Sequence, residues 1–106
     1  MKVVIDTNVV FEGPTKKGGA SRLVIEAWLS ELFVPCVSTA LIYEYWSVIT
    51  RKLSAARVSR LDPVLSEMLD HARHVEIYFT WRPSSPDPGD DFVIDCAVNA
   101  NAVVVT

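Results

Sequence analysis

The sequence has no apolar run long enough to span a membrane. Its longest uncharged stretch, Leu32 to Tyr43, covers twelve residues and contains Pro35, whereas a membrane helix needs about 18 or more apolar residues. Lys2 is followed by only three apolar residues before Asp6, so no secretory signal is visible. These absences predict a cytoplasmic protein with no membrane partner.

Cysteine and histidine are also scarce. Cys36 and Cys96 form neither a CxxC pair nor a disulfide framework, which indicates free buried thiols in a reducing compartment. His71 and His74 are expected on the exposed side of a helix, and a zinc site would need further ligands that are not evident. No Ser–His or Cys–His pair is evident, so we do not expect a covalent intermediate.

An excess of positive charge is lacking as well. The net charge is −3, from thirteen acidic and ten basic residues, which by itself argues against a nucleic-acid partner. Half of the residues are hydrophobic and 22% are charged, as in folded globular domains. The length suits one domain spanning residues 1–106.

The hydrophobic pattern alternates between short strands and helices. Apolar runs predict strands at Lys2 to Ile5, Phe33 to Val37, Val75 to Phe79 and Val103 to Val105. The first has no polar alternation, which is typical of a strand buried on both faces of a parallel sheet.

Helices are predicted between these strands. Apolar residues recur at helical spacing from Ser21 to Leu32, after a loop at Gly13 to Gly19. Ser38-Thr39 offers an N-cap for a helix of about 15 residues, Asp62-Pro63 starts a third helix, and Asp90 or Asp91 opens a last one. The alternation predicts an α/β fold with an open, mostly parallel sheet and helices on both faces.

Acidic residues stand at positions where this fold would bring them together. Asp6 ends the first strand, Asp90 and Asp91 open the helix before the last strand, and Glu44 lies on an otherwise apolar helix. Ligand sites in open α/β sheets lie beyond the carboxyl ends of the strands. Each acid also has a simpler explanation: a turn acceptor at Asp6, a helix cap at residues 90 and 91, and a solvated helix residue at Glu44. If they meet, an oxygen-only cluster suits Mg²⁺ or Mn²⁺.

Three segments resemble those of PIN-domain nucleases, in order and across nearly the whole chain. They are MKVVIDTNVVFEG, STALIYEYWSVI and DPGDDFVIDCAVNANAVVVT. The resemblance is greatest to VapC-like toxin components of prokaryotic toxin–antitoxin pairs. It implies a three-layer α/β/α fold and an endoribonuclease that hydrolyses RNA with Mg²⁺ or Mn²⁺. It also implies an antitoxin protein as partner and a homo-oligomer.

The resemblance assigns roles to individual residues. Asp6, Glu44 and Asp90 match the metal-binding and catalytic acids, with Asp91 as a further claimant for the metal. Thr7 and Asn8 match supporting positions that hydrogen-bond to the site. The family pattern continues past VVVT to a fourth acid and a closing strand and helix, so we expect a domain truncated at its C-terminus. Asp95 could replace the missing acid, but its spacing from Asp90 predicts an outward-facing residue.

Setting aside Asp6, Glu44, Asp90 and Asp91 leaves nine acids against ten bases, which weakens the objection from charge. Lys16, Lys17 and Arg22 flank the first loop and could contact RNA phosphates, as could the cations that end the second helix, Arg51 and Lys52. Ordinary solvated charges remain the alternative.

One alternative function stays open, and a second is disfavoured. A truncated PIN module could be catalytically impaired and act by binding an antitoxin or itself. A phospho-acceptor receiver domain would need a Lys after the last strand and a lone Asp after a middle strand, and neither is present.

Overall fold

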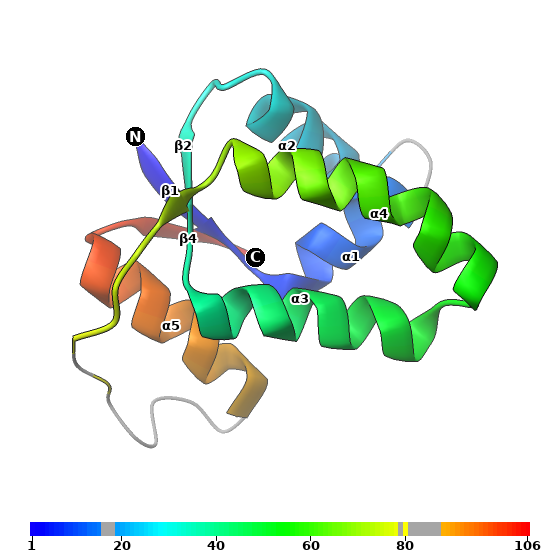
Figure 1. The fold of residues 1–106 in the computed structure, drawn as a ribbon. Coiled ribbons are helices and arrows are strands. Elements are labelled where there is room, and N and C mark those ends of the chain that lie inside the picture. Colours follow the sequence, from blue (N-terminus) through cyan, green and yellow to red (C-terminus); the bar gives the residue numbers. More distant parts are fainter. Residues whose placement is uncertain (16–18, 79, 81–87) are drawn as a thin grey trace.

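The computed structural model describes residues 1–15, 19–78, 80 and 88–106, with the side chains of 88–90 excepted. Strands and helices alternate along this part of the chain (Figure 1). The strands are β1 (Lys2–Ile5), β2 (Val34–Val37), β3 (Arg73–His74) and β4 (Val103–Val105). The helices are α1 (Thr7–Thr15), α2 (Ala20–Leu29), α3 (Thr39–Lys52), α4 (Ala55–Asp70) and α5 (Pro88–Ala100).

The strands of the described residues form one parallel sheet in the order β3-β2-β1-β4. Lys2 is opposite Val34 of β2, and Val3 is opposite Val103 of β4. The first strand therefore lies inside the sheet, between strands that come later in the chain. The predicted α/β class with a parallel sheet is confirmed.

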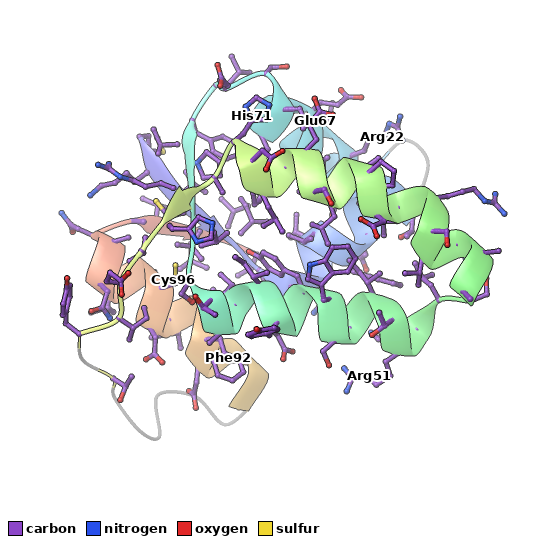
Figure 2. The ribbon with its side chains drawn as sticks, in the orientation of Figure 1. Arg22, Arg51, Glu67, His71, Phe92 and Cys96 are labelled. Carbon is purple, nitrogen blue, oxygen red and sulfur yellow. The ribbon has the colours of Figure 1, made fainter. Side chains whose placement is uncertain are left out.

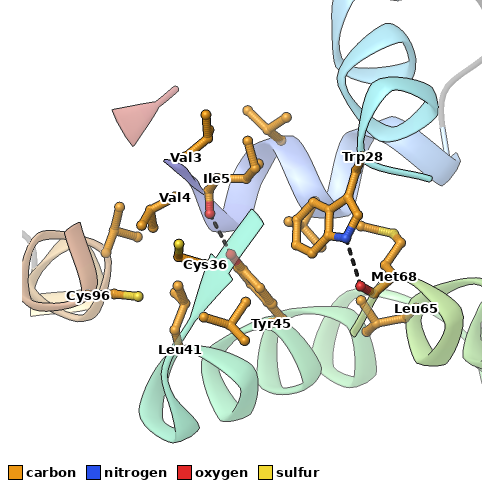
Figure 3. Packing of buried hydrophobic residues seen from close by; sticks show 14 of the residues in the cluster. Val3, Val4, Ile5, Trp28, Cys36, Leu41, Tyr45, Leu65, Met68 and Cys96 are labelled. Atoms are coloured by element: carbon orange, nitrogen blue, oxygen red, sulfur yellow. Dashed lines mark hydrogen bonds between the residues drawn. The ribbon is translucent and has the colours of Figure 1, made fainter. Parts of the chain in front are cut away.

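Both faces of β1 are covered. Val3, Val4 and Ile5 are all buried, although successive side chains of a strand point to opposite faces. Helix α5 packs against β1, β2 and β4. Figure 3 shows Val4 and Cys36 on the side of Cys96 of α5. The buried cluster continues to Trp28, whose indole N–H donates to the Met68 carbonyl at 2.7 Å (Figure 3).

The sequence does not predict one of the helices, and another starts earlier than predicted. Helix α1 at Thr7–Thr15 is not predicted, and it includes Gly13 and Pro14, where the sequence predicts a loop. Helix α4 begins at Ala55, because Ser54 caps it by accepting from the backbone N–H of Arg57 at 3.3 Å. The predicted start at Asp62-Pro63 is therefore wrong, and Pro63 lies inside the helix, between the buried Leu61 and Leu65.

The predicted strand Val75 to Phe79 is also wrong where the structure describes it. The strand consists of Arg73 and His74, and the Val75 N–H makes the last bond, to the Val37 carbonyl at 2.8 Å. Beyond Val37 the neighbouring chain turns into the Ser38 cap of α3, so residues after 75 have no strand to pair with. Phe79 lies outside the described residues.

The two histidines are exposed as predicted, but they do not share a helix. His71 caps the C-terminus of α4 and His74 lies in β3. His71 Nδ1 is 3.0 Å from Glu31 Oε1, a contact on the surface.

Strand β4 forms one edge of the sheet. Val103 is 56% exposed and Val104 is 37% exposed, so the edge presents apolar side chains to solvent. Among the described helices, none has the length and apolar character needed to cross a membrane.

Candidate metal centre at the carboxyl ends of the strands

Asp6 connects the first strand to the first helix. Its N–H donates to the carbonyl of Val105 at 2.9 Å, and its own carbonyl accepts from the N–H groups of Val9 at 3.1 Å and Val10 at 3.2 Å. The same residue thus completes the pairing of β1 with β4 and starts α1. Its side chain, partly buried, projects from the carboxyl end of a central strand.

The next two residues have different environments. Thr7 is buried, and its Oγ1 has no hydrogen-bond partner among the described residues. Asn8 is exposed in the first turn of α1. A buried hydroxyl beside Asp6 is available to a further ligand, since buried polar atoms are normally satisfied. The supporting roles of both residues stay predictions.

The helix that carries Glu44 is fixed to the end of β1 by the next residue, Tyr45. The fully buried Tyr45 donates its hydroxyl to the carbonyl of Ile5 at 2.6 Å (Figure 3), and this bond fixes α3 across the end of β1. Burial raises the pKa of Tyr45 well above its usual value, and the charges of Cys96 and Asp6 add to the effect. The adjacent Glu44 is partly buried.

Helix α5 contributes two buried carboxylates. Asp91 is 6% exposed and Asp95 is 7% exposed. Residues four apart lie on the same side of a helix, so these two acids share one side of α5. Our expectation that Asp95 faces outward is wrong: the spacing had been measured from Asp90, and measured from Asp91 it places Asp95 on the inner side.

The direction of α5 places its acids toward the carboxyl ends of the strands. Ala100 ends the helix just before β4, and β4 runs parallel to β1. The helix packs against β1 and runs opposite to it, so its first turns lie toward the carboxyl end of β1, where Asp6 is. The helix begins at Pro88, which makes Asp90 and Asp91 residues of the first turns and not caps.

Several predicted residues lie outside the part that the structure describes. These are the side chain of Asp90 and the residues Lys16 and Lys17. Arg22 is exposed and lies 3.5 Å from Glu26 on the same helix. Within the described residues, no three His, Cys, Asp or Glu side chains stand close enough to hold a metal ion. The described members of the predicted set, Asp6, Glu44 and Asp91, therefore do not form such a group by themselves. Since the side chain of Asp90 lies outside the described residues, the full set of ligands stays a prediction.

Both cysteines are free and buried, as predicted. Burial raises the pKa of Cys36, and it raises the pKa of Cys96 to about 12. The thiols are therefore protonated at neutral pH, and neither is an activated nucleophile. The chemistry available here is that of carboxylates at the end of a parallel sheet.

The sequence profile of the family described as "PIN domain" matches residues 2–106. The chain belongs to the PIN-domain family. PIN domains are generally nucleases and typically use divalent metal ions, which agrees with the position of the acids. The match spans all of the elements described above. Neither curated protein sequences nor solved structures gave a significant match.

Sequence reasoning missed the contribution of Tyr45. Nothing in the local sequence distinguishes a buried tyrosine that bonds to a neighbouring strand from one that only fills space in the core. Asp95 could have been found by measuring helical spacing from Asp91 as well as from Asp90.

Proposed function

We propose that this PIN-domain protein is a metal-dependent endoribonuclease, the toxin component of a toxin–antitoxin pair. The observation that carries the proposal is the burial of Asp91 and Asp95 on the part of α5 that lies toward Asp6. Carboxylate oxygens are the ligands that hard cations such as Mg²⁺ and Mn²⁺ prefer. Buried carboxylates on the side of α5 near Asp6 therefore support a metal-dependent reaction.

The residues at hand suit Mg²⁺ or Mn²⁺. Asp6, Glu44, Asp91 and, by the family pattern, Asp90 would provide carboxylate oxygens, and the buried Thr7 hydroxyl would add another oxygen. Both described cysteines are protonated within the core and both histidines lie at the surface, so soft-metal coordination has no candidate in this region.

A bound cation of this type lowers the pKa of a water molecule and neutralises charge on a phosphate. The chain itself then has three tasks. Asp6 and Glu44 hold their carboxylates at fixed positions, because the bonds of Asp6 to β4 and of Tyr45 to Ile5 fix the backbone on either side. Asp91 orients the attacking water by accepting its hydrogen bond. The apolar core beneath excludes other water.

The partners follow from the same family. RNA is the substrate, an antitoxin protein is the inhibitor, and copies of the chain associate with each other. The exposed edge of β4, with Val103 and Val104, supports association by strand addition. The same edge favours the second candidate function, a PIN module that binds an antitoxin or itself without cleaving RNA.

Cleavage of 5′-labelled single-stranded RNA in Mn²⁺ tests the proposal. The wild-type protein should cut the RNA, EDTA should stop the reaction, and Asp6→Asn should lower the rate by at least about 100-fold. Asp70→Asn is the matched control, because Asp70 is an exposed acid at the end of α4. Absence of cleavage together with absence of Mn²⁺ binding in calorimetry would leave the binding module as the function.

A further inference from the structure

A groove lies at the far end of α1 from the acids. Its volume is about 240 Å³, and it is lined by α1, by the end of α3 and by the first half of α4. Its lining combines four apolar residues with two arginines and a threonine. The lining residues are Pro14, Thr15, Leu53, Arg57, Arg60, Leu61 and Val64.

The groove is positively charged. Arg57 and Arg60 lie one turn apart on α4, and neither has a carboxylate partner among the residues that the structure describes. The segment 51–60 contains four basic residues and no acidic residue. Within a chain of net charge −3, this is a local concentration of positive charge that a polyanion would recognise.

Helix stability does not account for Arg57. It is the third residue of α4, where a positive charge opposes the helix dipole and costs about 0.3–1 kcal/mol. Arg51 and Lys52 lie at the end of α3, where cations are favourable. Figure 2 shows Arg51 at the end of α3 away from Phe92 and α5. A ligand for Arg57 explains its position better than its own helix does.

A path of contacts leads from the acids to the groove. Tyr45 of α3 bonds to Ile5 beside Asp6, and further along α3 the ammonium of Lys52 lies 5.2 Å from the ring of Phe11 in α1. The two helices therefore run side by side from the acids to the groove. Thr7 to Thr15 spans about 12 Å at ~1.5 Å per residue, which equals three to four nucleotides of stacked strand at about 3.4 Å each.

We infer that this groove binds the single-stranded RNA on one side of the cleavage position. Arg57 and Arg60 contact phosphates, Lys52 contacts the strand between the groove and the acids, and a base lies against Leu53, Leu61 and Val64. This inference rests on the proposed function for its substrate. The inference places the main RNA contact at the junction of α3 and α4, whereas the sequence pattern placed it around the first loop.

Fluorescence anisotropy with labelled single-stranded RNA in EDTA tests it, since EDTA separates binding from cleavage. Each phosphate contact on a single strand contributes about 0.7 to the slope of log K against log[salt]. Between 50 and 200 mM salt, Arg57→Gln with Arg60→Gln should lower the slope by about 1.4 relative to wild type. Arg57→Lys with Arg60→Lys should keep the slope, because it retains both charges. Arg73→Gln is the control, an exposed cation on β3 at the sheet edge opposite β4.

The possible outcomes distinguish RNA binding in the groove from RNA cleavage at the acids. One outcome is a slope that is unchanged in the glutamine variant while circular dichroism shows the lysine variant to be folded. That result would refute RNA binding in the groove, even if the wild type cleaves RNA. An arginine-dependent slope without cleavage would support the groove and overturn the nuclease. Binding of poly-glutamate but not of RNA, with the same dependence on the two arginines, would assign the groove to an acidic protein partner and overturn the inference.

Discussion

The hydroxyl of Tyr45 donates a 2.6 Å hydrogen bond to the carbonyl of Ile5, forty residues earlier in the chain. Tyr45 directly follows Glu44, and Ile5 directly precedes Asp6. One buried bond therefore fixes the relative position of the backbones that carry two candidate ligands, although neither residue of the bond belongs to the proposed metal set.

Tyr45→Phe should lower the free energy of unfolding by about 1 kcal/mol, since a buried hydrogen bond is lost with little change in packing. It should also weaken Mn²⁺ binding, because α3 loses its bond to β1. Urea denaturation and calorimetry measure the two effects. Tyr43→Phe is the control, since Tyr43 is 71% exposed. Equal unfolding free energies and equal Mn²⁺ affinities of the two variants would show that the Tyr45 bond does not position α3 for metal binding.

Alkaline pH should destabilise the fold. The pKa of Cys96 is raised from 9.0 to about 12 by burial, and the pKa of Tyr45 is raised as well. The unfolded chain then releases protons above pH 9 that the folded chain keeps, so stability falls as pH rises from 9 toward 12. Cys96 lowers stability by about 1.4 kcal/mol per pH unit in that window, and Tyr45 adds to the loss only above its usual pKa of 10.0.

Urea midpoints at pH 8 and pH 10.5 measure this effect. In Cys96→Ala the loss between the two pH values should be smaller, although the variant is less stable at both. A loss of the same size in the variant would show that Cys96 does not cause it.

Asp91→Asn should weaken Mn²⁺ binding by at least about tenfold, the lower range for removal of a group in a metal site. Ligand binding stabilises the folded state by RT ln(1 + [L]/Kd), so a tenfold weaker site gains about 1.4 kcal/mol less at saturating metal. Thermal shifts with and without Mn²⁺ measure this difference. Glu67→Gln, an exposed substitution on α4, should keep the full Mn²⁺-dependent shift. A full shift in Asp91→Asn as well would show that Asp91 does not contribute to metal binding.

Gly13→Ala should destabilise the packing of α1 on α2. A Cβ at Gly13 would overlap Cγ1 of the buried Ile25 and lie 3.0 Å from the carbonyl oxygen of Ser21. Overpacking of this kind costs about 1–3 kcal/mol. Gly19→Ala is a suitable comparison, because its nearest neighbour would be 4.0 Å away. Similar unfolding free energies for both variants would contradict the close contact.

Much of this fold could be predicted from local signals. The apolar run before Asp6 predicted β1 with its bounds, and Ser38 predicted the start of α3, where its side chain accepts from the Leu41 N–H at 3.2 Å. Both signals depend on residues adjacent in the chain. The parallel class followed from the alternation of elements.

The failures depended on contacts between distant residues. Asp62-Pro63 has the local chemistry of a helix start, but α4 begins earlier, at Ala55. The Ser54 cap and the burial of Leu61 stabilise its first turns. Residues 75–78 have the composition of a strand, but β2 ends at Val37 and leaves them no partner. The acids at strand ends were located, while the burial of Asp95 depended on how α5 is oriented against the sheet.

The bond from the Asp6 N–H to the Val105 carbonyl joins the end of β1 to the end of β4, 99 residues later in the chain. During synthesis β1 emerges first, and its pairing with β4 cannot form until residues 103–105 have left the ribosome. Such long-range pairing is among the last and slowest steps of folding. The position of Asp6 is therefore set late in folding, after β4 has paired with β1.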